Sequence, residues 1–252
     1  MITIAEPKNF DEWSNAVRSL IASGIEPRNV VWSNSGQMSL FGAELESQTS
    51  PTRILVPKRF MELAAIVACF NDPARWPLLY RIMYRIKHGE PDLLEFASDS
   101  DVREAYLMRK SVNRDIHKFH AFVRFRSVKC GVDDIFVAWH CPDHWTVELA
   151  TPFFARRFGS MRFSILTPKG CAHWDLKKLT FSSGVARDQT PQEDAFEDYW
   201  LTYYRSIFNP FRLKEKAMKR EFPVRHWPTL PESRLIPELI EEASGLASDR
   251  DD

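Results

Sequence analysis

The hydrophobic pattern of the chain changes from helical to strand-like near residue 121. Between residues 99 and 120, apolar residues such as Val112, Ile116 and Phe119 recur at the spacing of one helix face. Residues 121–128 alternate instead, and residues 135–140 form the expected hairpin partner. Because a long helix here leads straight into hairpin-linked strands, the pattern favours an α+β fold over a parallel βαβ sheet.

Other segments extend this prediction along the chain. Further helices are expected at residues 11–22, 58–70, 73–88, 145–158, 192–208, 210–221 and 232–243, and a short β-like run at 29–32. We expect a short, mostly antiparallel sheet packed with several helices, its strands lying near residues 121–128, 135–140, 162–167, 172–175 and 178–181. The chain then divides into an N-terminal helical and β segment (1–70) packed on a main domain (71–232), with a C-terminal helix and acidic tail (233–252).

Two helix boundaries carry local signals. Gly24 is expected to end the first helix, because glycine readily adopts the left-handed conformation that follows a helix. Asp72-Pro73 has the chemistry of an N-cap followed by the first helical position.

The charge of the chain is balanced overall but unevenly distributed. Formal net charge is +0, which argues against a generally basic nucleic-acid binder. Residues 109–168, however, contain ten Lys and Arg against five Asp and Glu, and residues 205–226 contain seven against two. Such segments can form a positive patch that attracts phosphate, although mixed surface charge is the simpler interpretation.

The four cysteines, Cys69, Cys130, Cys141 and Cys171, are widely spaced and form no CxxC motif. Zinc and iron–sulfur sites are therefore disfavoured, and no cofactor is predicted. Cys130, Cys141 and His144 lie close together in the sequence but give only weak support for a metal site. No signal segment opens the chain and no apolar run approaches membrane-spanning length. We expect a cytoplasmic protein with no membrane contact.

Basic residues surround the point where the periodicity changes. Arg114 and Lys118 lie on one side of the predicted helix, and Arg124 and Arg126 share one face of the strand predicted after it. If the two elements meet, these donors can converge on one anion. A solvated basic face is the alternative.

The same stretch contains residues suited to proton transfer. His117 and His120 can act as proton donors near neutral pH, and Asp115 is a third candidate for acid–base chemistry. A core histidine bonded to the backbone is the competing interpretation.

Two later segments supply further candidates. Arg156 and Arg157 end a predicted helix, where they also suit the helix dipole, and Arg162 opens the next strand. His173 and Asp175 share a strand face and can form an acid–base pair, unless Asp175 simply caps a turn. No nucleophile elbow is present, so a hydrolytic triad is not supported.

The region from 193 to 216 combines acids, aromatics and bases. Asp194 and Asp198, four residues apart, can hold a metal or supply a general base, although they also suit a helix start. Tyr204 beside Arg212 and Lys214 would make a stacking and phosphate-binding surface for single strands if the tyrosine faces solvent.

An ordered series of motifs gives the chain a family resemblance. These motifs are Phe10–Trp13, Gly24, Trp32, Val56-Pro57, Asp72-Pro73, Leu78-Leu79-Tyr80-Arg81, Arg114–Lys118, His120–Arg126, Pro152–Phe158, Ser164–Pro168, His173-Trp174-Asp175, Tyr203-Tyr204, Ile207–Pro210, Trp227 and Leu230-Pro231-Glu232. The sequence resembles a bacterial DNA-metabolism domain of unknown function, often found N-terminal to a UdgX-type uracil-DNA glycosylase domain. The resemblance covers nearly the whole chain and is strongest from Pro73 to Glu232.

The resemblance implies a protein of DNA repair or modification that binds DNA or a damaged nucleotide and works with a radical-SAM DNA-repair protein. The sequence ends soon after Glu232, so a stand-alone version is expected and uracil excision is not carried over. Its phosphate-binding residues would be Arg114, Lys118, Arg124, Arg126, Arg156, Arg157, Arg162, Tyr204, Arg212 and Lys214, and its acid–base candidates His117, His120, Asp115, His173 and Asp175. A nuclease or glycosylase-like hydrolase and an adaptor without DNA contact remain alternatives.

Overall fold

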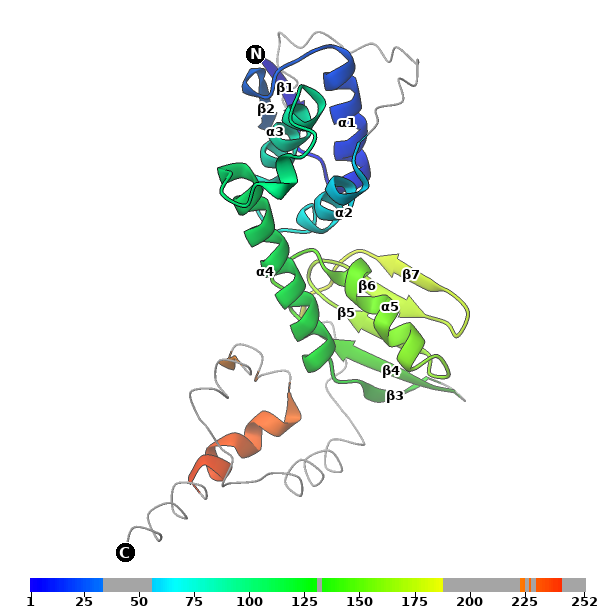
Figure 1. Ribbon diagram of the computed structural model, residues 1–252. Helices are drawn as coiled ribbons and strands as arrows, with labels where there is room; N and C mark the ends of the chain where they lie inside the picture. The colour runs from blue at the N-terminus through cyan, green and yellow to red at the C-terminus, as the bar shows by residue number, and fades with distance from the viewer. Residues whose placement is uncertain (34–55, 131–132, 188–222, 225–226, 228–229, 242–252) are drawn as a thin grey trace, which may run out of the picture. The chain divides into compact units, whose positions relative to one another are not determined.

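A computed structural model describes residues 1–33, 56–130, 133–187, 223–224, 227 and 230–241 (Figure 1). The chain divides into two compact units. The N-terminal unit comprises Met1–Asp115 with Asp143–Trp145, and the sheet unit comprises Ile116–Pro142 with Thr146–Asp252. The boundary falls inside helix α4 (Ser100–Phe122).

The N-terminal unit begins with a small βαβ arrangement. Strand β1 (Ile2–Ala5) pairs in parallel with β2 (Val30–Ser33), and helix α1 (Phe10–Ala22) connects them. Sequence reasoning finds α1 and β2 but misses β1, whose four residues are too few for a clear alternation. Gly24 ends α1 as predicted: its φ is 65°, and the amide of Ile25 donates to the carbonyl of Leu20.

Two further helices, α2 (Lys58–Val67) and α3 (Arg75–Lys87), complete the core of this unit. Trp13, Phe60 and Trp76 are fully buried within it. The prediction that Asp72-Pro73 starts a helix is wrong by two residues. The side chain of Asp72 accepts from the amide of Ala74, which forms a turn before the helix instead of capping it.

Ion pairs hold the start of α4 within the N-terminal unit. Arg85 contacts Glu90 at 2.7 Å and Asp99 at 2.8 Å, and Arg81 contacts Asp101 at 2.9 Å. The acidic segment before α4 is therefore matched by arginines of α3.

The sheet unit contains a five-stranded mixed sheet (Figure 1). Its strands are β3 (Arg126–Cys130), β4 (Asp133–Trp139), β5 (Phe163–Leu166), β6 (Cys171–Trp174) and β7 (Leu179–Ser182), which neighbour one another in chain order. Every pairing is antiparallel except that of β4 with β5, which helix α5 (Val147–Arg157) separates in sequence. The predicted α+β fold with a mostly antiparallel sheet is confirmed.

The strand predicted from residue 121 starts later, because α4 continues to Phe122 and β3 begins only at Arg126. The amide of Val123 still donates to the carbonyl of Phe119 in the helical pattern. Arg124 donates to the carbonyl of Ala121 at 2.7 Å and so satisfies an acceptor at the helix end. The expected strand face shared by Arg124 and Arg126 does not exist.

The alternation of the strands gives the sheet two different faces. On the helix face, Phe163, Ile165 and Ala172 pack with Phe119 of α4 and Phe154 of α5, and Figure 1 shows α5 lying over β5 and β6. We call the opposite side the distal face. By strand register it presents Arg126, Val128, Ile135, Val137, Trp139, Ser164, Leu166, Cys171, His173, Thr180 and Ser182. Described residues between 116 and 187 contain no α-helix besides the end of α4 and α5.

Near the C-terminus, a 3-10 helix at Pro231–Leu235 is followed by helical residues 236–241. The helices predicted at 192–208 and 210–221 lie outside the described residues. Across the described part of the chain, no helix has the length and apolar character needed to cross a membrane.

The packing of α3 predicts the effect of truncating a core side chain. Leu79 is fully buried, whereas Leu107 on α4 is 59% exposed. A Leu79→Ala variant should lose about 2–5 kcal/mol of unfolding free energy in urea, because it leaves a cavity. The matched Leu107→Ala variant should lose less than about 0.5 kcal/mol. Equal losses in the two variants would contradict this core assignment.

Candidate nucleic-acid interface

A row of hydrogen bonds crosses the distal face from β5 to β7. Ser164 Oγ lies 2.9 Å from Nδ1 of His173, and Nε2 of His173 lies 2.8 Å from Ser182 Oγ. The row forms because Ser164 and His173 are register partners and Ser182 lies diagonally opposite on the neighbouring strand. The imidazole is thus held between two hydroxyls, each of which can donate or accept.

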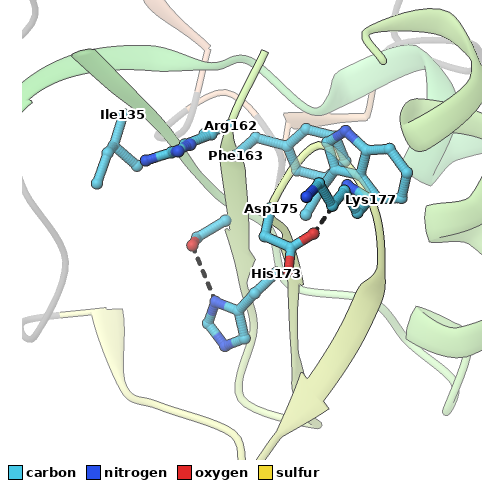
Figure 2. A pocket seen from close by; sticks show the side chains of 8 residues that line it. Ile135, Arg162, Phe163, His173, Asp175 and Lys177 are labelled. Carbon is cyan, nitrogen blue, oxygen red and sulfur yellow. Dashed lines mark hydrogen bonds between the residues drawn. The ribbon is translucent and has the colours of Figure 1, made fainter. Parts of the chain in front are cut away.

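An open pocket of about 500 Å³ lies beside this row, where β5 begins and β6 ends (Figure 2). Its lining consists of Ile135, Arg162, Phe163, Ser164, His173, Trp174, Asp175 and Lys177. Arg162, His173 and Asp175, three residues singled out by sequence, therefore meet in one cavity. The volume falls within the range of small-molecule sites.

The carboxylate of Asp175 stabilises the turn that follows β6. Its Oδ1 accepts from the amides of Lys177 at 2.8 Å and Lys178 at 2.7 Å, and Leu176 between them has a φ of 80°. These amides hold the pKa of the Asp175 carboxyl below its ordinary value. Since both ring nitrogens of His173 bond to serines, the structure does not bring His173 and Asp175 together as an acid–base pair.

Cationic and aromatic groups share the distal face. Arg126 lies on β3 opposite Val137, and the guanidinium of Arg187 stands 5.3 Å from the ring centre of Trp139. Nε1 of Trp139 has no hydrogen-bond partner among the described residues. The face thus combines positive charge with an aromatic ring whose Nε1 is buried.

The part of the sheet unit that forms the sheet and α5 is basic, whereas residues 188–252 of the same unit contain more acidic than basic residues. Residues 116–142 and 146–187 contain eleven Lys and Arg and four Asp and Glu, an excess of +7. In the N-terminal unit, Arg85 forms ion pairs with Glu90 and Asp99. The excess of basic residues between 116 and 187 gives the sheet a positive field.

The residues around the end of α4 separate onto two faces. His120 donates from Nε2 to the carbonyl of Ala150 at 3.0 Å and stacks on Phe153 at 4.3 Å, which places it against α5. Burial lowers the pKa of His120, and the nearby charges of His117 and Arg156 act in the same direction. Arg126 lies on the distal face instead, so this stretch does not form the single anion site that its spacing suggests.

The other basic candidates differ in their exposure. Arg114 and His117 on α4 are exposed, and Lys118 is half-buried. Arg156 and Arg157 are exposed at the end of α5 and do not line the pocket. Tyr204, Arg212, Lys214, Asp194 and Asp198 lie outside the described residues.

Asp115 is buried in the N-terminal unit, where its two carboxylate oxygens accept from the amides of Asp143 and His144, both at 3.0 Å. Nδ1 of His144 accepts from the amide of Asn71, so Nε2 carries the ring proton and donates to Ser111 Oγ at 2.9 Å. With its proton on Nε2, His144 cannot act as the base that deprotonates Ser111. No cluster of three or more metal-ligating side chains occurs among the described residues.

Sequence reasoning missed several residues of this region. Ser164, Ser182, Trp139 and Lys177 join it through strand pairing and through the β6–β7 turn. The alternation of residues around His173 indicates which residues of the same strand share its face. The sequence does not indicate how β5, β6 and β7 pair in register.

Comparison with known families gives one match. Residues 73–232 match a family described as a domain of unknown function (DUF4130), and the chain belongs to this family. The match includes α3, α4, α5 and the whole five-stranded sheet. No curated protein and no solved structure matches the chain.

The burial of His120 predicts a pH dependence of stability. Its pKa is lowered from 6.5 in the folded protein, so the unfolded chain binds the proton more readily as the pH falls. The contribution of neutral His120 is complete above about pH 6.5 and is lost as the pH falls towards the folded pKa. In urea unfolding at pH 8 and pH 5, His120→Gln should lose less stability on acidification than the wild type. Equal losses would refute this.

Proposed function

We propose that this protein acts in DNA metabolism, in repair or modification, and that it holds DNA on the distal face of its sheet. The observation that carries the proposal is the gathering of Arg126, Arg187 and Trp139 on that face, within a basic stretch of the sequence. Arginine binds phosphate through paired donors, and its positive charge releases counterions from DNA.

The shape of the surface favours a strand whose bases are accessible. A sheet face with aromatic and cationic groups can contact bases and backbone together, whereas a groove reader requires a protruding helix or ribbon. Hydroxyls of Ser164 and Ser182 and the imidazole of His173 add polar groups along the same surface. We therefore infer a preference for single-stranded or locally unpaired DNA.

The distal face predicts a measurable salt dependence. Affinity for a single-stranded oligonucleotide, measured by fluorescence anisotropy, should fall steeply as salt rises. Arg126→Ala/Arg187→Ala should weaken binding about tenfold and reduce the slope of log affinity against log salt by about one to two. Arg18→Ala/Arg103→Ala, which removes two exposed arginines of the N-terminal unit, is the matched control and should bind like wild type.

Two results would count against the proposal. Absent or salt-insensitive DNA binding would leave the adaptor as the better account. Cleavage or base release without any partner would favour the hydrolase, whose proposed carboxylates Asp194 and Asp198 lie outside the described residues.

The resemblance to DNA-metabolism domains also supports a radical-SAM partner. The chain has no CxxxCxxC cluster of its own, so we assign the radical chemistry to that partner. A tagged protein should retain the radical-SAM protein on an affinity column after nuclease treatment. Retention only before nuclease treatment would mean that DNA bridges the two proteins, and no retention in either case would remove the partner from the proposal.

A further inference from the structure

The pocket at the end of β5 and β6 has a divided lining. Arg162 and Lys177 supply positive charge and are exposed, whereas the half-buried Ile135 and Trp174 supply apolar lining. Figure 2 shows Arg162 and Lys177 on different sides of the cavity, with His173 and Asp175 between them. The pocket therefore offers separate regions for an anionic and an apolar part of one ligand.

Trp174 provides a wall whose orientation is fixed. Its Nε1 donates to the carbonyl of Gly159 at 3.1 Å, and its ring packs against the helix-face core. A ring held in this way loses little conformational entropy when a ligand binds against it. The turn that presents Lys177 is also fixed, because Asp175 accepts from its amide.

The mixture of charges in the pocket narrows the ligand class. A site for inorganic phosphate alone gains nothing from the carboxylate of Asp175, which repels anions. A ligand that has both a phosphate and hydrogen-bond donors can use the cations and the carboxylate together, as the amino edge of a base does with an acidic side chain. Aromatic walls suit the same ligand, since a base has a flat π-face.

We propose that this pocket binds a single nucleotide whose phosphate contacts Arg162, whose base lies near Trp174 and whose amino edge lies towards Asp175, with the positive charge of Lys177 at the rim. The inference rests on the proposed function and deepens it, because the nucleotide can belong to a bound DNA strand or be free in solution. A nucleotide swung out of a strand would lie beside the distal face that holds the backbone.

The test measures binding of the four deoxynucleoside monophosphates by calorimetry, with the matching deoxynucleosides and inorganic phosphate as separate probes. At least one monophosphate should bind about tenfold more tightly than its nucleoside and than inorganic phosphate, because it uses both regions. Arg162→Ala and Lys177→Ala should each weaken that binding about fivefold or more. Lys178→Ala, which removes the neighbouring cation that does not line the pocket, should stay within about twofold of wild type.

The outcomes separate this inference from the proposed function. If single-stranded DNA binds but no monophosphate does, or if the two pocket variants bind monophosphate like wild type, the pocket inference is overturned and the proposed function stands. If a monophosphate binds with the expected sensitivity but DNA does not, the pocket stands and the DNA proposal fails. If an oligonucleotide competes for the monophosphate in the wild type, the nucleotide of a strand is the occupant.

Discussion

The sheet unit depends on one apolar layer, in which Phe119 and Phe154 pack against Phe163 and Ile165. Burial of these side chains fixes which side of β5 and β6 faces the helices, because neighbouring residues of a strand point to opposite sides. Ser164 and His173 are placed on the distal face as a direct consequence. A shift of one residue in β6 would turn His173 towards the helices and Trp174 towards the distal face.

A chain of zero net charge can contain a basic surface because its acidic residues are concentrated elsewhere in the sequence. Residues 188–198 contain five acids and no base, and residues 232–252 contain seven acids and two bases. Near the start of α4, acidic residues form ion pairs with Arg81 and Arg85. The pocket can select a ligand by shape as well as by charge, because its lining combines Arg162 and Lys177 with aromatic residues.

Local patterns predicted much of the fold but only part of the site. The alternation around Ser164 and His173 was enough to predict β5 and β6, and Gly24 correctly marked the end of α1. The end of α4 was missed because Arg124 satisfies a helix carbonyl with its side chain, an effect that periodicity does not report. Lys177 was missed because its position depends on the turn fixed by Asp175.

The most direct test of the central claim is ultraviolet crosslinking of a single-stranded oligonucleotide, followed by mass-spectrometric mapping of the adducts. If crosslinking followed solvent exposure alone, it would occur mainly at Trp145, which is 48% exposed. Trp139 and Trp174 are only partly exposed. Our account predicts that the adducts concentrate on the distal face, at Trp139 of β4. Adducts concentrated on Trp145 or elsewhere in the N-terminal unit would contradict it.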